Sequence, residues 1–301
     1  MNIACPRCGF EEPESATECA RCGIVFGKWS PSLSRPLVPQ MPARPAAVRA
    51  REKADFKILA YGLAAAIVVY AIPFTRFVFS AIVTLFHEFG HAVVGWLMGY
   101  PSLPAFDLVY GGGITQHGQF HLSIALAIAG GIGYLGWRFR DDRTIVVALA
   151  VFFIVWLFFV STEWRRDLAF SAAGHVSEFV IAGIFFYQAL AGVGWRSPEV
   201  ERPLGAFVAF FVQINSMGFA WRLMHDLDFL EWYKQGKGGM LMNDLESIAL
   251  DLHIHTPFNP GIIGVTRMLF FFGFVPIAVA LLLYFRPGIL DPILRVFSSN
   301  A

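Results

Sequence analysis

The sequence predicts a mainly α-helical polytopic membrane bundle of about seven spans, preceded by a small amino-terminal domain. Of its 301 residues, 56% are hydrophobic and only 15% are charged, which excludes an ordinary soluble domain. Apolar stretches of about 18 to 28 residues recur along the chain, and roughly 20 residues suffice for a helix to cross a bilayer. All four cysteines fall within the first 22 residues. The composition therefore divides the chain into a cysteine-containing domain over 1–29, a linker over 30–56 and a membrane domain over 57–301.

The four cysteines form two Cys-x-x-Cys pairs, Cys5 with Cys8 and Cys19 with Cys22, separated by ten residues. Two such pairs can place four thiolates around one tetrahedral zinc ion. Four protein ligands leave no open position, so we expect a structural Zn²⁺ in a zinc ribbon. Two disulfides or a redox dithiol are the alternatives. Because the ribbon is slightly acidic, nucleic acid is not an expected partner, and a cytosolic protein partner stays open.

The linker over 30–56 contains five prolines between residues 31 and 45, a spacing that favours extended polyproline II or disorder. Basic residues follow immediately before the first predicted span, at Arg49, Arg51, Lys53 and Lys57. Basic residues beside a first span usually stay in the cytosol. We therefore expect an integral protein of the lipid bilayer, in a bacterial inner membrane, with its ribbon in the cytosol.

The membrane domain is expected to cross the bilayer about seven times. The predicted spans are 58–75, 77–98, 120–137, 144–162, 168–195, 203–221 and 268–285. Threaded from a cytosolic amino terminus, they place the segment 225–260 in the cytosol and the arginines of 138–143 on the opposite side.

The second predicted span carries His87-Glu88-Phe-Gly-His91, an HExxH pattern. Residues four apart lie on one face of a helix, so His87 and His91 can bind one ion while Glu88 activates water beside it. Ionisable groups inside a membrane helix each cost several kcal/mol unless they bind something or line a wet cavity. We therefore expect a catalytic Zn²⁺ here, with Glu88 as general base. Histidines that merely hydrogen-bond neighbouring helices, or a metal-free site, are the alternatives.

The thirteen residues HEFGHAVVGWLMG, from His87 to Gly99, resemble the site-two-type intramembrane metalloproteases. The resemblance continues through 106–120, which looks like the short β-hairpin that follows the motif helix in that family. It implies a zinc-dependent endopeptidase that cleaves membrane-embedded or membrane-proximal protein segments. In the family, such a hairpin can bind the substrate backbone as an added strand.

The resemblance also implies a third zinc ligand, an Asp in an Asn-x-x-Pro…Leu-Asp-Gly motif that this chain lacks. Asn215 is followed three residues later by Gly218 instead of Pro, and Leu-Asp228 is followed by Phe229 instead of Gly. The third ligand must therefore come from elsewhere.

Depth along the helices predicts where that ligand lies, because the ligands of one ion must meet at one level. At 1.5 Å rise per residue, His175 and Glu178 lie within about 10 Å of the level of the HExxH pattern. We expect His175 or Glu178 to be the third ligand, with the other as its orienting partner. Alternatively, the pair hydrogen-bonds across the bundle. Gln213 and Asn215, at comparable depth, are candidates for substrate binding or for hydrogen bonds between helices.

Two other functions stay open. Glu88-x-x-His91 and His175-x-x-Glu178 also fit the Glu-x-x-His element of a di-iron carboxylate bundle, which would make the chain a non-proteolytic membrane metalloenzyme. A catalytically inactive scaffold that recruits a partner through the ribbon is the non-enzymatic alternative.

Overall fold

The computed structural model describes residues 2–6, 10–28, 46–107, 112–236 and 242–286, with the side chains of the first membrane-domain helix described from Asp55 onwards. The chain divides into two compact units, Met1–Ala50 and Arg51–Ala301.

The first unit contains a small antiparallel sheet of β1 (Asn2–Ala4) and β2 (Glu11–Pro13), followed by a short 3₁₀ helix over Phe26–Lys28. Cys5 follows β1 directly and is buried, as is Cys19. The buried Glu12 carboxylate accepts a hydrogen bond from the Ala20 backbone N–H at 2.7 Å. This bond fixes the turn around the second cysteine pair against β2.

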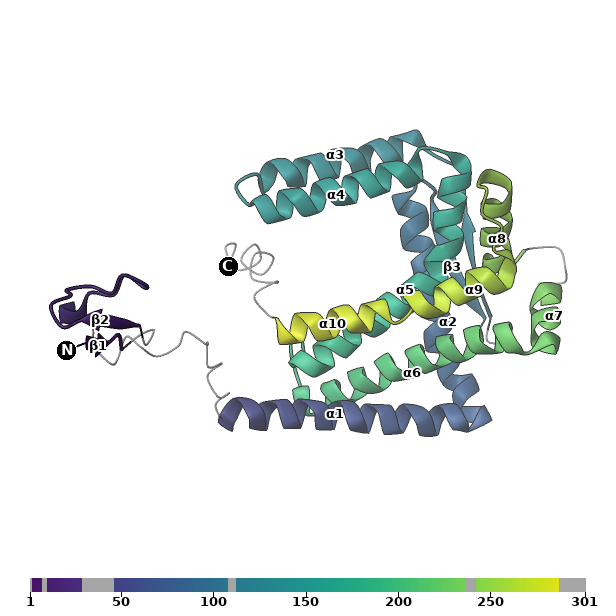
Figure 1. The fold of residues 1–301 in the computed structure, drawn as a ribbon. Coiled ribbons are helices and arrows are strands. Elements are labelled where there is room, and N and C mark those ends of the chain that lie inside the picture. The colour runs from purple at the N-terminus through teal and green to yellow at the C-terminus, as the bar shows by residue number, and fades with distance from the viewer. Residues whose placement is uncertain (1, 7–9, 29–45, 108–111, 237–241, 287–301) are drawn as a thin grey trace. The chain divides into compact units, whose positions relative to one another are not determined.

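The second unit is a helical bundle with one two-stranded sheet (Figure 1). Its helices are α1 (Ala46–Ala71), α2 (Pro73–Leu97), α3 (Leu122–Arg138), α4 (Arg143–Val160), α5 (Glu163–Ala191), α6 (Pro198–His225), α7 (Leu227–Gln235), α8 (Asp244–His255), α9 (Gly261–Phe272) and α10 (Val275–Phe285). Its sheet pairs β3 (Ser102–Asp107) with β4 (Gly112–His117) in antiparallel register, with Ala105 opposite Ile114. The hairpin expected after the HExxH helix is therefore present.

Five helical segments in the described part of the chain are long and apolar enough to cross a membrane. They are Pro73–Leu97, Arg143–Val160, Glu163–Ala191, Pro198–His225 and Gly261–Phe285. The mainly helical membrane class is thus confirmed, but seven spans were expected. The other two expected spans fall on α1 and α3. Helix α3 has 17 residues, or about 25 Å at 1.5 Å per residue, which is short of a hydrocarbon core of about 30 Å.

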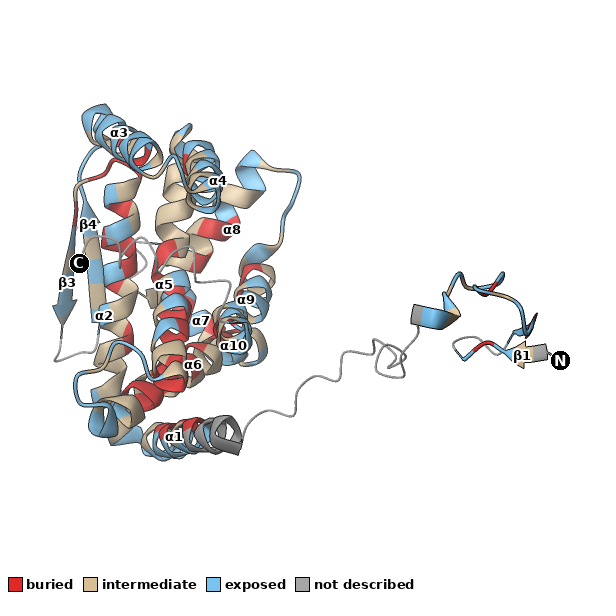
Figure 2. Ribbon diagram, turned by 90° about the vertical axis from the view of Figure 1, so that its left-hand side faces the viewer, coloured by how far each residue is buried: buried red, intermediate tan, exposed pale blue. Residues whose placement is uncertain are grey.

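The helices are not threaded up and down in simple alternation. The axes of α1, α3 and α4 are nearly parallel, whereas α2 crosses them steeply in both views (Figures 1 and 2). One membrane normal cannot be parallel to both sets. As a result, the start of α1 and the α3–α4 turn lie at one end of the unit, and α7 and α8 lie at the other (Figure 1). The threading expected from the sequence instead placed 225–260 with the start of α1 and 138–143 opposite.

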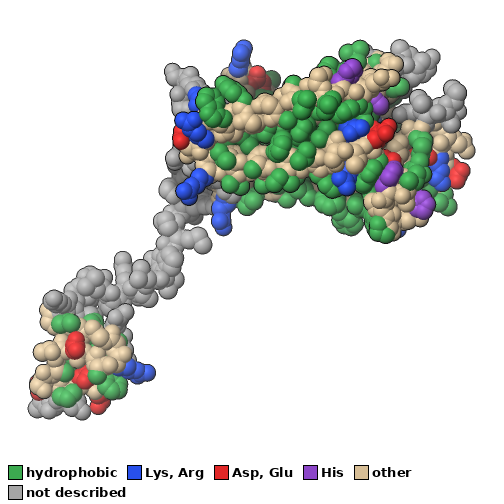
Figure 3. Space-filling view, turned by 90° about the horizontal axis from the view of Figure 1, so that it is seen from above, with side chains coloured by type: hydrophobic (Ala, Val, Ile, Leu, Met, Phe, Trp, Pro, Cys, Tyr) green, Lys and Arg blue, Asp and Glu red, His purple; other side chains and the backbone are tan. Residues whose placement is uncertain are grey.

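Helix α5 is the centre of the bundle, with buried residues along most of its length where it packs between α2, α6 and α10 (Figure 2). Its contact with α6 includes Leu190 packed against Ala206 and Ala209, all at most 1% exposed. Small residues allow such close contacts between helices. In a membrane these contacts matter because moving an apolar side chain from lipid into a helix interface gives no hydrophobic gain. The outer surface is largely apolar along the helices, as expected for contact with lipid (Figure 3).

Candidate metal centre and adjoining cavities

Helix α2 presents His87 and His91 on one face towards α5, as the i, i+4 spacing predicts. Gly174 on α5 lies directly opposite the two rings. A Cβ atom at this position would collide with the Nε2 atoms of both imidazoles. Because Gly174 has no side chain, the two rings have room to meet at this position.

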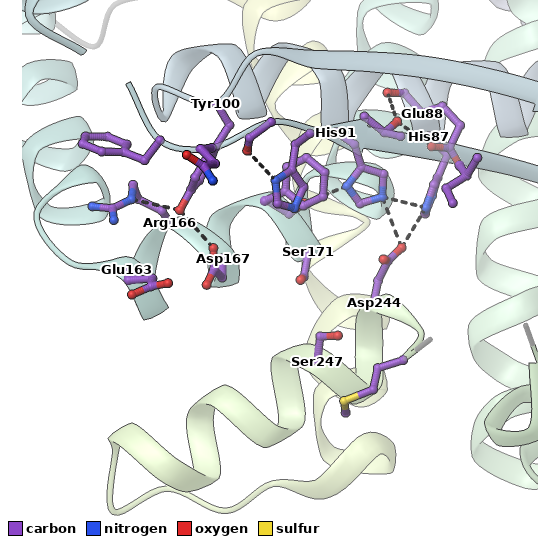
Figure 4. A pocket seen from close by; sticks show the side chains of 18 residues that line it. His87, Glu88, His91, Tyr100, Glu163, Arg166, Asp167, Ser171, Asp244 and Ser247 are labelled. Atoms are coloured by element: carbon purple, nitrogen blue, oxygen red, sulfur yellow. Dashed lines mark hydrogen bonds and ion pairs between the residues drawn. The ribbon is translucent and has the colours of Figure 1, made fainter. Parts of the chain in front are cut away.

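The two imidazoles converge with a carboxylate that the sequence analysis did not single out (Figure 4). The Nε2 atoms of His87 and His91 lie 3.0 Å apart, and Asp244 Oδ2 lies 2.9 Å from the first and 3.2 Å from the second. Donor atoms at about 2.0–2.2 Å from a tetrahedral zinc ion are separated by about 3.3 Å. The described residues thus include a His87–His91–Asp244 group that could hold a metal ion.

The other nitrogen of each ring has its own partner. His91 Nδ1 lies 2.7 Å from the Phe170 carbonyl oxygen, which can only accept a hydrogen bond. His87 Nδ1 lies 2.6 Å from Glu178 Oε1, and the second oxygen of Glu178 accepts from the Ser216 hydroxyl. Both rings are therefore held with Nδ1–H as donor, which leaves the Nε2 lone pairs directed at the shared position.

The structure brings His175 and Glu178 to the HExxH residues, as the depth argument expected. His175 Nδ1 lies 3.3 Å from Glu178 Oε1, and its ring is centred 4.7 Å from that of His87. His87, His175 and Glu178 form a second group that could hold a metal ion. The two groups share His87 but use its opposite nitrogens.

Asp244 is positioned by the start of α8, which does not span the membrane. Asn243 precedes it and forms a capping box with Glu246, and the Asn243 side chain donates to the Tyr233 carbonyl oxygen at 2.5 Å. Burial alone would raise the pKa of Asp244, but its close contacts with the His87 and His91 rings hold that pKa well below its usual range. The Asn-Asp-x-Glu sequence over 243–246 signals a helix start, but nothing local to it indicates a metal ligand.

The chain matches no family model, no curated protein and no solved structure. The resemblance drawn from the HExxH segment and the hairpin therefore has no support from relatives. The function has to be inferred from the geometry of the site.

Glu88, the second residue of the motif, is 5% exposed. Its carboxylate Oε2 accepts a hydrogen bond from the Thr115 hydroxyl of β4 at 2.6 Å. Strand β4 thus lies directly over the carboxylate that was expected to act as general base.

Two cavities meet at His87, Glu88 and Asp244. The larger, about 800 Å³, extends along β4 to Tyr100 and Arg166 at the start of α5 (Figure 4). The smaller, about 290 Å³, is lined by Ser80, Thr84, Asn215, Ser216 and Asn243, among others. Two cavities therefore border the candidate metal centre.

The structure separates the two predicted substrate-binding residues. Asn215 lines the smaller cavity beside His87 and Glu88. Gln213 instead donates from Nε2 to the carbonyl oxygen of Gly273 at 3.1 Å, at the break between α9 and α10. Only Asn215 therefore borders the site.

In the first unit, Cys5, Cys19 and Cys22 form a further group that could hold a metal ion. The Sγ atoms of Cys5 and Cys22 lie 3.6 Å apart. Cys8, the remaining predicted ligand, lies outside the described residues.

Proposed function

We propose that this chain is a zinc-dependent intramembrane endopeptidase that cleaves membrane-embedded or membrane-proximal protein segments. The observation that supports it most is the convergence of two imidazole nitrogens and one carboxylate oxygen beside a buried Glu88, inside a bundle of apolar helices. Such a set of ionisable groups is costly in a membrane protein unless it binds something.

The ligands proposed are His87, His91 and Asp244. Two nitrogens and one carboxylate oxygen suit zinc and leave a fourth position open for water or substrate. Glu178 acts as the orienting partner of His87, because its Oε1 holds the ring through Nδ1. His175, Glu178 and His87 remain the competing ligand group. Bound zinc would lower the pKa of water and polarise the peptide carbonyl.

The chain's own residues supply the rest of the chemistry. Glu88 takes a proton from the attacking water as oxygen bonds to the peptide carbon, and returns it to the amine as the C–N bond breaks. Strand β4 pairs with β3 on one side only among the described residues, so its other edge can receive an extended substrate segment. Residues of β4 line the larger cavity beside Glu88. Asn215, in the smaller cavity, is placed to hydrogen-bond the substrate backbone on the opposite side.

The ribbon is proposed to hold a structural zinc ion through Cys5, Cys8, Cys19 and Cys22. This site would fold the first unit and present it to a cytosolic protein partner. Its closed ligand set makes it independent of the chemistry in the membrane domain.

The test is cleavage of a fluorescein-labelled β-casein by the purified protein in detergent, since casein is extended and requires no specific recognition. We expect cleavage that a chelator abolishes and zinc restores. Glu88→Gln should lower the rate by about 10²- to 10⁴-fold, the usual contribution of a general base. Glu231→Gln, on the exposed face of α7, is the matched control and should leave the rate unchanged.

Equal cleavage by the Glu88→Gln variant would contradict the proposal and favour the scaffold alternative. The contacts give no support to a di-iron centre. Each of the two groups in the membrane domain that could hold a metal ion contains one carboxylate, Asp244 or Glu178, whereas a di-iron carboxylate bundle uses four.

A further inference from the structure

Strand β4 presents two residues to the Glu88 side chain. Gly113 and Thr115 are two apart and so lie on one face of the strand. A Cβ atom at Gly113 would lie 2.5 Å from Glu88 Cγ, 2.6 Å from its Oε1 and 2.9 Å from its Cδ. Thr115 donates to Glu88 Oε2 at 2.6 Å, and its hydroxyl oxygen lies 3.1 Å from the Glu88 backbone carbonyl oxygen.

We propose that Gly113 and Thr115 form a seat for the Glu88 carboxylate, and that both are positioning residues for the general base. This inference rests on the proposed function. The backbone of Gly113 limits the carboxylate from one side, and the Thr115 hydroxyl fixes one of its oxygens. Holding a glutamate side chain in one rotamer costs conformational entropy, and these contacts offset that cost. A hydrogen bond to a carboxylate is stronger than a neutral one and directional enough to set the carboxylate plane.

Strand β4, which holds the Glu88 carboxylate, also lines the cavity in which the substrate would bind. The cavity beside Glu88 is lined by Ile114, Thr115 and His117 of the same strand. A segment added along β4 would therefore be registered against the strand that holds the base. Displacement of a reacting group by about 1 Å can lower the rate about 100-fold. Holding the base and the substrate on the same strand should therefore have a measurable effect on kcat.

The competing explanation is that Thr115 merely attaches the hairpin to α2. If Thr115 only attached the hairpin, any variant that loosened the hairpin would lower both the stability of the protein and its affinity for substrate. If Gly113 and Thr115 position the base, their substitution should lower kcat alone. The effect should depend on the hydroxyl group of residue 115 and on the absence of a side chain at residue 113.

The experiment uses the full chain, labelled β-casein and matched pairs of variants. Thr115→Val keeps the shape and removes the hydroxyl, and Thr115→Ser restores it. Gly113→Ala adds a methyl group against the carboxylate, whereas Gly112→Ala adds one on the same strand where nothing lies within 4 Å. We expect Thr115→Val to lower kcat by about 10- to 100-fold and Gly113→Ala by about 100-fold, with KM and bound zinc unchanged. Thr115→Ser and Gly112→Ala should remain within about threefold of the unmodified chain.

Combination with Glu88→Gln tests whether the effect passes through the base. In that background, Thr115→Val should cause no further loss, because the group it positions is already gone. An inactive Glu88→Gln variant together with fully active Thr115→Val and Gly113→Ala variants would overturn the seat and leave the proposed function intact. Equal losses in Thr115→Ser and Thr115→Val, or in Gly112→Ala and Gly113→Ala, would also overturn it. A fully active Glu88→Gln variant would overturn both proposals.

Discussion

Individual side chains at the candidate centre differ in which atom they offer. Asp244 Oδ2 lies close to the Nε2 atoms of both His87 and His91, whereas Glu178 Oε1 contacts His87 through Nδ1 and lies 3.3 Å from His175 Nδ1. An imidazole bound to a metal through Nε2 usually donates its Nδ1–H to a carboxylate or a carbonyl. Glu178 and the Phe170 carbonyl group have this role towards His87 and His91.

This difference predicts the order of zinc affinities. Asp244→Ala should abolish tight binding in the membrane domain, and Glu178→Gln should weaken it by about 10- to 100-fold. Zinc is measured by titration with a competing chelator, in a background whose ribbon cysteines are replaced by Ser so that one site is observed. The control is Asp226→Ala, which removes an exposed cap of α7, a residue that accepts from the Phe229 N–H.

Retention of zinc by Asp244→Ala, with loss in His175→Ala, would show that the ion binds the competing group of His87, His175 and Glu178. Asp226, two residues before Asp228, begins a short helix, where a hydrogen bond from the Phe229 N–H lowers its pKa.

Pairs of helices set the distance at which the ligands meet. Contact between α2 and α5 is close at two glycines, because a Cβ at Gly90 would lie 2.5 Å from the Ala173 carbonyl oxygen and one at Gly174 would collide with both imidazoles. At Gly90 the obstacles are the Ser177 side chain and the Ala173 backbone carbonyl group, and because backbone cannot turn aside, a side chain would push the helices apart. At Gly174 the obstacles are ring atoms, which can turn away.

Gly174→Ala is therefore expected to displace the rings and lower zinc affinity by at least about 10-fold while the protein still folds. Gly130→Ala on α3, where nothing lies within 4 Å, is the matched control and should leave affinity unchanged. Zinc titration and a thermal melt in detergent measure the two effects. Unchanged zinc affinity in Gly174→Ala would mean that the rings are not confined as described.

The whole membrane domain has two distinct ends. The start of α1 and the α3–α4 turn lie at one end, where several Lys and Arg side chains are visible in Figure 3. Helices α7 and α8, with the candidate centre, lie at the other (Figure 1). The bias of basic residues towards the cytosol predicts that the first end is cytosolic.

Single cysteines at three exposed positions test this topology in a chain whose ribbon cysteines are replaced by Ser. With a membrane-impermeant thiol reagent, we expect Lys234→Cys to be labelled in intact cells. Lys57→Cys and Arg140→Cys should be labelled only after permeabilisation, because both lie at the end where α1 begins. Labelling of Arg140→Cys from the side opposite to Lys57→Cys would instead restore the alternation of seven spans.

The sequence by itself determined the features that depend on neighbouring residues. Apolar runs predicted the helices, and a four-residue spacing put His87 and His91 on one face, because both follow from the geometry of a single helix. The hairpin was predicted over 106–120 from its resemblance to a family; β4 lies within that segment, whereas β3 begins four residues before it.

Only the tertiary structure decided which carboxylate reaches the two histidines as the candidate third ligand. Asp244 is 157 residues from His87 and lies on a helix outside the predicted spans, so neither helical spacing nor hydropathy relates the two. The depth argument compared residues within the predicted spans, so it brought His175 and Glu178 to the HExxH residues, as observed, but it did not consider Asp244. Convergence of side chains depends on how helices cross and on the face each one presents, and that is set by packing between residues far apart in the chain.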